Sequence, residues 1–225
     1  GAARARAAGA EIRETSPALG LARENGAWRV WAPAGEVLAE RVVLATNVDL
    51  DRLDARARRL ASPVRTFMLE TAPLPDLPDW AAHAAFDTSL ALRYMRRTAG
   101  GRLRFGAGGW PGRATPPMAM RWLRRALARA IPALAEARIE RGWSGLVDVT
   151  RDGMPRFAHE DGLYRLLGFC GHGIALATLA GLLVADAIDG DARDFERLAG
   201  LAQTRLWPTR LGQAAQLVLG RAAPA

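Results

Sequence analysis

The stretch that most constrains the fold lies late in the chain, where the apolar segment GLYRLLGF (162–169) runs into CGHGIALATLAGLLVADAI (170–188). A buried strand followed directly by a buried helix is predicted here, which indicates layered α/β structure. Gly171 and Gly173 lack the Cβ atoms that would keep a ligand away from the first N–H groups of that helix. Those N–H groups and the positive end of the helix dipole favour an anion or a partial negative charge. A plain helix start with close packing is the alternative.

Cys170 and His172, in the same stretch, are poor candidates for chemistry of their own. They stand two positions apart, no second cysteine exists, and His83 and His159 lie in unrelated contexts, so no metal site is predicted. A Cys–His nucleophile is also not predicted, because side chains at i and i+2 on a strand-to-helix turn diverge and no orienting partner follows. His83 and His159 are expected to be surface or structural residues.

Composition narrows the class of protein further. The 225 residues suit one large domain or two small ones, with 50% hydrophobic and 24% charged residues. The net charge of +8 comes from dispersed arginines, since the chain has no lysine, and no nucleic-acid partner is predicted. The apolar run 174–188 is shorter than the ~20 residues that span a bilayer, so no membrane partner is predicted either. A single cysteine excludes an intramolecular disulfide and fits a cytoplasmic protein.

The first sixty residues predict a helix end, a meander and a second helix. The chain opens on GAARARAAG, without Met and as if within a helix, which suggests a fragment. Residues 11–46 alternate apolar and polar side chains between ENG and PAG turns, as an antiparallel meander does. RVVLAT (41–46) is typical of a strand buried on both faces. Residues 49–60 carry acids early and arginines late, which favours a helix.

From Ser62 onward the pattern predicts strands around one amphipathic helix. Residues 62–80 and 90–110 predict strands, with a hairpin at 97–105. Residues 115–134 predict a helix with Pro116 and Pro117 in its first turn. Residues 137–150 predict a further strand, and a turn separates it from the strand at 162–169. The apolar face of the helix is expected to comprise Met118, Trp122, Leu123, Ala126, Leu127 and Ile131.

Four segments in this order resemble the C-terminal part of the FAD-dependent D-amino acid oxidase/glycine oxidase family. They are RVVLATN, RRTAGGRLRFGAGG, IERGWSGLVDVTRDGMPRF and GLYRLLGFCGHGIALATLAGLLVADAIDG. Among subgroups, the pattern is most similar to the gamma-glutamylputrescine oxidase-like amine oxidases. The resemblance implies an α/β (α+β) fold, the C-terminal part of an FAD/NAD(P)-binding Rossmann-like domain with an inserted antiparallel-sheet substrate domain. It assigns 1–61 and 142–200 to a partial FAD-binding domain without its N-terminal βαβ unit, 62–141 to the substrate-binding domain, and 201–225 to a C-terminal tail.

The resemblance also implies where FAD is bound. The end of the 41–46 strand would lie near the ADP portion, and the segment 142–155 would line the isoalloxazine ring. The loop GFCGHG (168–173) would place a helix N-terminus at the pyrimidine edge of the flavin, where it stabilises negative charge. The residues expected to bind the cofactor are Ala45, Thr46, Trp143, Gly145, Asp152, Pro155, Gly171, His172 and Gly173.

Departures from the family pattern bear on the cofactor and the substrate. No Gly-x-Gly-x-x-Gly motif for the ADP pyrophosphate occurs. Relatives that attach FAD covalently carry a cysteine at the position of Gly145, so non-covalent FAD is implied. Carboxylate anchors of relatives would stand at Val147 and Ala175, and both are missing. An amine is therefore expected as substrate, or an amino acid held by Arg102 or Arg156.

The function implied is FAD-dependent oxidation of a C–N bond in a small amine or amino acid. The substrate would give a hydride to the flavin, the imine would hydrolyse, and reoxidation would yield hydrogen peroxide. No catalytic side chain and no oligomeric state are assigned. The alternative is a truncated, non-catalytic part of such an oxidoreductase that needs the missing nucleotide-binding half. An arginine-rich binding module is disfavoured because the arginines are dispersed.

Overall fold

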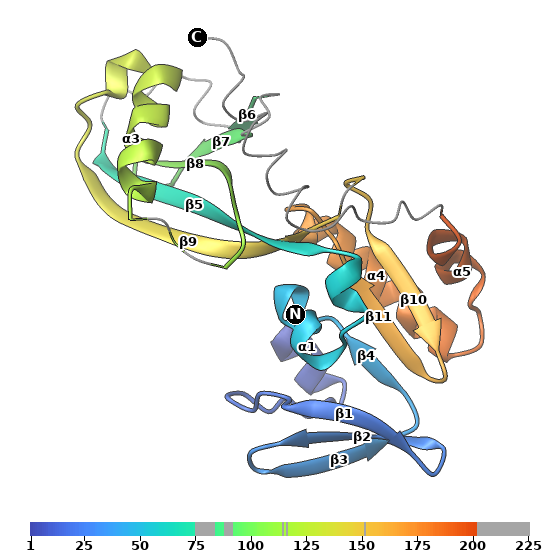
Figure 1. The fold of residues 1–225 in the computed structure, drawn as a ribbon. Coiled ribbons are helices and arrows are strands. Elements are labelled where there is room, and N and C mark those ends of the chain that lie inside the picture. The colour runs from blue at the N-terminus through green and yellow to red at the C-terminus, as the bar shows by residue number, and fades with distance from the viewer. Residues whose placement is uncertain (75–83, 88–91, 114, 116, 151, 202–225) are drawn as a thin grey trace.

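A computed structural model describes residues 1–74, 84–87, 92–113, 115, 117–150 and 152–201. They form two three-stranded sheets and one five-stranded sheet. In Figure 1 the five-stranded sheet and α3 occupy one end of the molecule, and the two smaller sheets with α4 and α5 occupy the other. The predicted mixed α/β (α+β) class is confirmed. His83 and, apart from Leu201, the expected C-terminal tail lie outside the described residues.

The N-terminal part is a short helix followed by the predicted meander. The helix is α1 (Ala2–Ala7), and the strands are β1 (Gly20–Glu24), β2 (Ala27–Ala32) and β3 (Gly35–Ala39). The strands pair antiparallel in the order β1-β2-β3. Asn25 and Gly26 join β1 to β2 with φ values of 51° and 85°. Positive φ at both residues of a two-residue loop matches the right-handed twist of the strands, which explains the Asn-Gly sequence.

A second sheet has the order β10-β11-β4 and carries the C-terminal helices. β4 (Val42–Leu44) runs parallel to β11 (Leu163–Leu167), and β10 (Arg156–Glu160) runs antiparallel to β11. All five residues of β11 are buried, as predicted. The helices are α4 (Gly173–Ile188) and α5 (Arg193–Ala199). The core between this sheet and the helices contains Phe157, Tyr164, Leu166, Ala180, Val184 and Phe195.

The predictions of burial for the 41–46 strand and for the helix at 173–188 are wrong in this structure. β4 is an edge strand, and Val43 on it is 41% exposed. On α4 only Ala180 and Val184 are buried, whereas Ile174 is 94% exposed and Leu182 61% exposed. The sequence therefore gives both the strand and the helix two apolar faces. In each of them, other described residues cover only one of these faces.

The third sheet is antiparallel, with the order β6-β7-β8-β5-β9. Its strands are β5 (Ser62–Pro73), β6 (Ala85–Phe86), β7 (Arg93–Arg97), β8 (Arg102–Pro111) and β9 (Ile139–Val149). β7 and β8 form the predicted hairpin. β9 pairs with β5 from Thr71 back to Ser62, so one strand crosses the expected boundary between 141 and 142.

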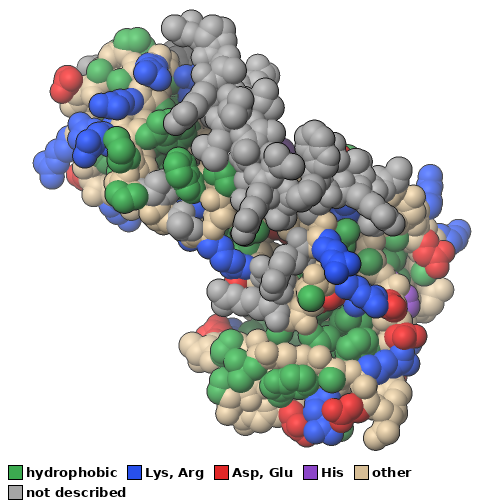
Figure 2. Space-filling view, viewed as in Figure 1, with side chains coloured by type: hydrophobic (Ala, Val, Ile, Leu, Met, Phe, Trp, Pro, Cys, Tyr) green, Lys and Arg blue, Asp and Glu red, His purple; other side chains and the backbone are tan. Residues whose placement is uncertain are grey.

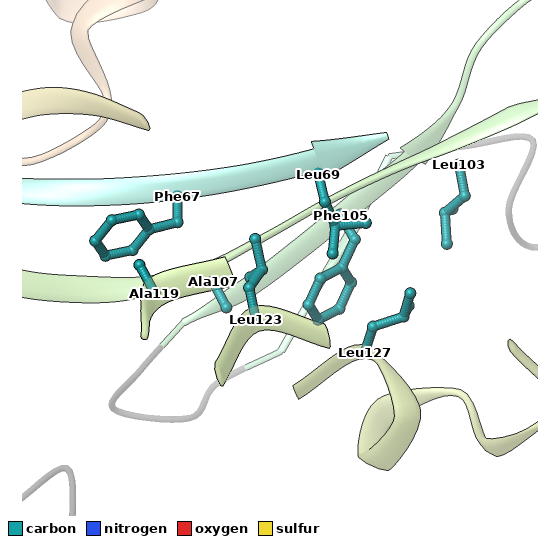
Figure 3. Packing of buried hydrophobic residues seen from close by; sticks show 8 residues of the cluster. All are labelled: Phe67, Leu69, Leu103, Phe105, Ala107, Ala119, Leu123 and Leu127. Carbon is teal, nitrogen blue, oxygen red and sulfur yellow. The ribbon is translucent and has the colours of Figure 1, made fainter. Parts of the chain in front are cut away.

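Helix α3 (Ala119–Ala130) covers one face of this sheet and is followed by the 3-10 turn η4 (Pro132–Leu134). Figure 3 shows Leu123 and Leu127 of the helix on either side of the Phe105 ring of β8. Alternate residues of β5 and β8 supply the sheet side of this core, as a strand with one buried face requires. The cluster comprises Phe67, Leu69, Leu103, Phe105, Ala107, Ala119, Leu123 and Leu127.

Two local predictions need correction. The segment 49–60 is not one helix but the 3-10 turn η1 (Asn47–Asp49), a single turn α2 (Leu50–Leu53) and the 3-10 turn η2 (Ala57–Arg59). Early acids and late arginines stabilise a helix through its dipole only where the helix is continuous, and the helix is interrupted here. Helix α3 has Met118 as its N-cap, so Pro117 precedes the first turn, and Pro116 lies outside the described residues. Met118 and Trp122 are more than a third exposed, so the buried face is narrower than predicted.

The α3 core should dominate the stability of the five-stranded sheet. Leu123→Ala is expected to lower the free energy of unfolding by about 3 kcal/mol, because it removes a fully buried side chain and leaves a cavity. Arg124→Ala on the exposed side of the same helix should change it by less than about 0.5 kcal/mol. Urea unfolding followed by circular dichroism measures both, and equal effects would contradict this packing.

Candidate functional site

The turn between β11 and α4 has an unusual backbone. Gly168, Cys170 and Gly171 have φ values of 76°, 50° and 87°. A Cβ at Gly168 would collide with the Cγ2 atom of Thr150, so only glycine fits there. This run of left-handed residues turns the chain from the buried strand into the helix and leaves His172 as the exposed N-cap.

Asp148, at the end of β9, holds this turn in place. Its carboxylate accepts a hydrogen bond from the N–H of Gly168 at 2.5 Å, and its carbonyl accepts one from the N–H of Cys170 at 3.1 Å. Asp148 is buried, so these bonds form away from bulk water. Two contacts with protein oxygens occupy the Cys170 thiol, which lies 3.1 Å from the Gly168 carbonyl and 3.4 Å from Thr150 Oγ1. Cys170 thus has a structural role.

The end of β4 joins the same junction through Asn47. The Asn47 Nδ2 donates to the Leu146 carbonyl at 3.0 Å, and its Oδ1 accepts from the Asp148 N–H at 3.2 Å. The two residues before it are Ala45 and Thr46, expected to approach the cofactor, and both are exposed. Three distant segments, 45–47, 146–150 and 168–173, therefore meet at one place. Sequence reasoning did not single out Asn47 or Asp148, although a polar residue at the end of each strand was a usable signal.

Three of the expected cofactor-binding residues are glycines that face open space. At Gly145, Gly171 and Gly173, an added Cβ would meet no other described atom within 4 Å. The positive φ of Gly171 explains that glycine, but Gly145 and Gly173 have no such requirement. His172 makes no side-chain cap, and the first turn of a helix leaves its N–H groups without partners inside the helix. The surface can therefore accept a closely approaching group with partial negative charge.

Asp152 and Arg156 are bound to each other in the turn between β9 and β10. Arg156 Nη2 lies 2.7 Å from both carboxylate oxygens of Asp152, and the Arg156 side chain is only 2% exposed. Burial acts to raise the pKa of Asp152, but hydrogen bonds from Arg156 and the Met154 N–H, with attraction to Arg156, outweigh it and lower this pKa to about 2. The pair braces the turn that contains Pro155, and it leaves Arg156 little capacity to hold a substrate.

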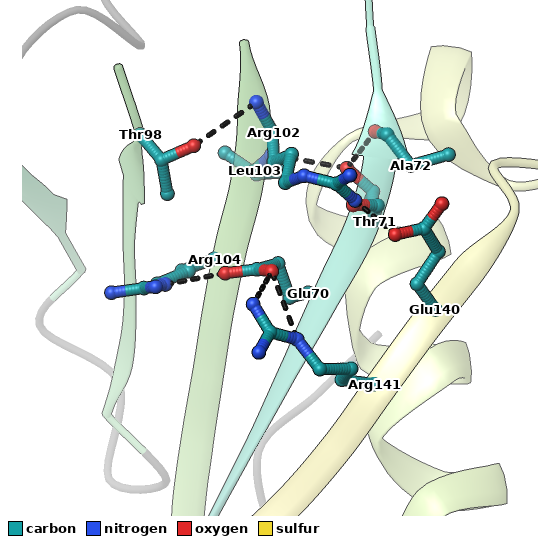
Figure 4. Close-up of polar contacts among 9 residues, drawn as sticks. All are labelled: Glu70, Thr71, Ala72, Thr98, Arg102, Leu103, Arg104, Glu140 and Arg141. Atoms are coloured by element: carbon teal, nitrogen blue, oxygen red, sulfur yellow. Dashed lines mark hydrogen bonds and ion pairs between the residues drawn. The ribbon is translucent and has the colours of Figure 1, made fainter. Parts of the chain in front are cut away.

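Trp143 and Arg102 belong to the five-stranded sheet but lie far apart on it. Trp143 pairs with Met68 and is partly exposed. Arg102 pairs with Pro73, forms an ion pair with Glu140 and donates to the Thr71 carbonyl at 3.2 Å (Figure 4). At about 3.3 Å per residue, the five positions between the β5 partners Met68 and Pro73 correspond to roughly 16 Å. The structure thus does not bring Arg102 to the expected flavin site.

Metal and membrane features are absent from the described residues. No group of three or more His, Cys, Asp or Glu side chains in this part of the chain could hold a metal ion. His159 stacks on Tyr164 with ring centroids 4.2 Å apart and accepts a hydrogen bond from the Gly162 N–H, which is a structural role. No described helix is long and apolar enough to cross a membrane.

Two solved structures with the same fold are a glycine oxidase and an L-proline dehydrogenase. Glycine oxidase from Bacillus cereus superposes with a TM-score of 0.76 and 25% identity, over 91% of this chain and 57% of that one. L-proline dehydrogenase from P. horikoshii gives a TM-score of 0.70 and 25% identity, over 83% of this chain and 53% of that one. The particular family follows from the sequence, which matches the FAD dependent oxidoreductase (DAO) family over residues 2–187. The chain belongs to this family.

Curated relatives include both amine and amino-acid enzymes. Gamma-glutamylputrescine oxidoreductase of Escherichia coli is 30% identical over 199 residues, which is 85% of this chain and 44% of that protein. Glycine oxidase of Geobacillus kaustophilus is 30% identical over 214 residues, 89% of this chain and 54% of that protein. The chain thus spans about half the length of the curated relatives it matches.

The Asp152–Arg156 pair predicts an acid-dependent loss of stability. Because the pKa of Asp152 is lowered from 3.8 to about 2, the pair stabilises the fold above pH 4, and this contribution is lost as the pH falls through about 2. Asp152→Asn should lower the free energy of unfolding at pH 7 by about 2 kcal/mol, and the difference from wild type should vanish near pH 2. Asp194→Asn, on the exposed side of α5, is the control. A difference that is constant with pH would contradict the pairing.

Proposed function

We propose that this chain forms the part of an FAD-dependent oxidoreductase that faces the flavin ring and the substrate, and that the complete enzyme oxidises a C–N bond of a small amine or amino acid. The observation that carries the proposal is the glycine-lined turn at the start of α4, held by Asp148 and open to a ligand. Membership of the FAD dependent oxidoreductase family supports the same cofactor. When bound, FAD would accept the two electrons that the substrate loses as a hydride when its C–N bond is oxidised to an imine.

The residues present fit a flavin held without a covalent bond. The N–H groups in the first turn of α4, next to Gly171, His172 and Gly173, would face negative charge on the cofactor, and the bare backbone at Gly145 would let a flat ring approach closely. A glycine at 145 also offers no atom for covalent attachment. Ala45 and Thr46 would lie by the nucleotide portion, with Trp143 beside the ring.

Asp152 and Pro155 would support the site rather than contact the reacting atoms. The Asp152–Arg156 pair fixes the turn that follows β9, and β9 carries Asp148 at its end. The chain's part in the reaction is then to position the flavin and to stabilise negative charge with backbone dipoles.

A second candidate function is a subunit or portion that becomes active only with a further nucleotide-binding segment. The exposed apolar side of α4 and β4 favours it. A hollow of about 340 Å³ is lined by Val43, Ala45, Phe169 and the small residues of α4, Ala177 and Gly181 among them. Figure 2 shows hydrophobic side chains also gathered in the part of the molecule that contains β1 to β4. Apolar surface of this kind is normally buried against another element.

Flavin binding tests the first function. The purified chain mixed with FAD should retain the absorbance of an oxidised flavin, near ~450 nm, after gel filtration. Gly173→Val should weaken FAD binding at least about tenfold, since a side chain would fill the space left for the ligand. It should leave the unfolding midpoint unchanged, because no described atom lies near the new Cβ. Gly100→Ala, in the hairpin turn, is the control. A protein that stays colourless with FAD would contradict FAD binding by this chain and favour the second function.

The second function predicts that α4 drives self-association. Ile174→Ser and Leu182→Ser should reduce association in sedimentation velocity while changing the free energy of unfolding by less than about 0.5 kcal/mol, because both side chains are exposed. Val184→Ser on the buried side of the same helix should instead destabilise the fold by roughly 2 kcal/mol. A monomeric wild-type chain that binds FAD tightly would speak against the need for a further segment.

A further inference from the structure

One row of charged residues crosses the five-stranded sheet from β7 to β9. In the strand register Arg96 lies opposite Arg104, Arg104 opposite Glu70, and Glu70 opposite Arg141. Figure 4 shows Glu70 between Arg104 and Arg141. The row lies on the face opposite α3, because the intervening residues of the same strands, such as Phe105, belong to the α3 core.

The charges in this row do not balance. Glu70 is almost fully buried, accepts a hydrogen bond from Arg104 Nε at 2.6 Å and one from Arg141 Nε at 3.1 Å, and forms an ion pair with Arg141 Nη2. Glu70 thus binds two of the three guanidinium groups in the row, and Arg141 is also attracted to Glu140. Among the described residues, no carboxylate is bound to Arg96. Arg96 and Arg104 stand directly opposite each other on adjacent strands, and like charges in that relation destabilise a sheet. An additional anion would relieve this repulsion.

Arg104 has hydrogen-bonding capacity left for such an anion. It contacts Glu70 only through Nε, and Figure 4 shows the other end of its guanidinium directed away from Glu70. Among the described residues, its two terminal nitrogens have no recorded partner. The Arg104 side chain is 33% exposed and that of Arg141 65% exposed, so both are open to a small molecule. A guanidinium edge with two free nitrogens matches the geometry of a carboxylate.

The neighbouring row on the same face is apolar and aromatic. Tyr94 pairs with Gly106, Gly106 with Met68, and Met68 with Trp143. A Cβ at Gly106 would collide with the Tyr94 ring and the Met68 sulfur, so these two side chains fill the space above the glycine. Two residues along a strand separate the rows, which is about 7 Å. A small ligand could therefore place a charged end on the arginines and its body against this platform.

We propose that Arg96, Arg104 and Arg141 bind the carboxylate of the substrate, which is then an amine that carries a carboxylate group. Glu70 holds the Arg104 and Arg141 guanidiniums in place. This inference rests on the proposed oxidation of an amine or amino acid and replaces Arg102 and Arg156 as the carboxylate anchors. Arg102 is paired with Glu140, and Arg156 is buried against Asp152.

Arginine side-chain NMR on the isotope-labelled chain tests the proposal without FAD or turnover. The probes are 4-aminobutanoate and 1,4-diaminobutane at equal ionic strength. They have the same number of carbon atoms and differ by a carboxylate in place of one CH2–NH3+ group. The Nε–H signals of Arg104 and Arg141 should shift saturably with 4-aminobutanoate and stay unchanged with 1,4-diaminobutane. Arg104→Gln should weaken binding about tenfold or more, as expected for loss of a charge-assisted hydrogen bond.

Two further variants keep the test decisive. Arg104→Gln removes a partner of buried Glu70 and so can destabilise the fold. Arg96→Gln removes a charge from an exposed side chain that makes no recorded bond to Glu70, and it should weaken binding several-fold with unchanged unfolding. Arg121→Gln on α3, across the sheet, should have no effect. Unshifted Arg104 and Arg141 signals, or equal binding of inorganic phosphate, would overturn the proposal. Flavin binding would be unaffected by that result, so the proposed function would stand.

Discussion

The structure depends on the hydrogen bonds that Asp148 makes at the end of β9. β9 belongs to the five-stranded sheet, whereas the turn from Gly168 to His172 follows β11 of the β10-β11-β4 sheet. The Asp148 carboxylate and carbonyl bind the N–H groups of Gly168 and Cys170, and its own N–H is held by Asn47 after β4. One buried residue therefore ties together two sheets and the start of α4. Without it, the backbone groups of the turn would be buried without partners, which is costly.

The Asp148 hydrogen bonds fix the turn in which the glycines of the site have two different roles. Gly168 is required inside, where Thr150 leaves no room for a side chain. Gly145 and Gly173 face outward, and no described neighbour explains the absence of a side chain there. The same sequence of glycines thus serves packing on one side of the turn and ligand access on the other. Cys170, the most conspicuous residue of the stretch, is held between Gly168 and Thr150 and contributes to the first of these roles.

Much of the fold could be predicted from local patterns, and the failures have physical reasons. The Asn25-Gly26 turn and the β7–β8 hairpin follow from local sequence alone. Burial of α4 and β4 was wrong because apolar residues on two faces predict two partners, and the described residues supply one. The prediction of one helix at 49–60 was wrong. Its charge pattern stabilises a helix only where the backbone stays helical, and here the backbone forms three short turns. Asn47 and Asp148 were missed as organisers, since their partners lie about a hundred residues away or in another sheet.

The central claim is that the Asp148-held turn presents backbone N–H groups to a flavin, and amide chemical-shift mapping tests it most directly. Addition of FAD to the nitrogen-15-labelled chain should shift the amide signals of Gly171 to Ala175 and of Gly145, and leave those of α3 unchanged. Shifts confined to α3 or to the β1–β3 meander would contradict the account, as would a turn whose signals do not respond to bound FAD.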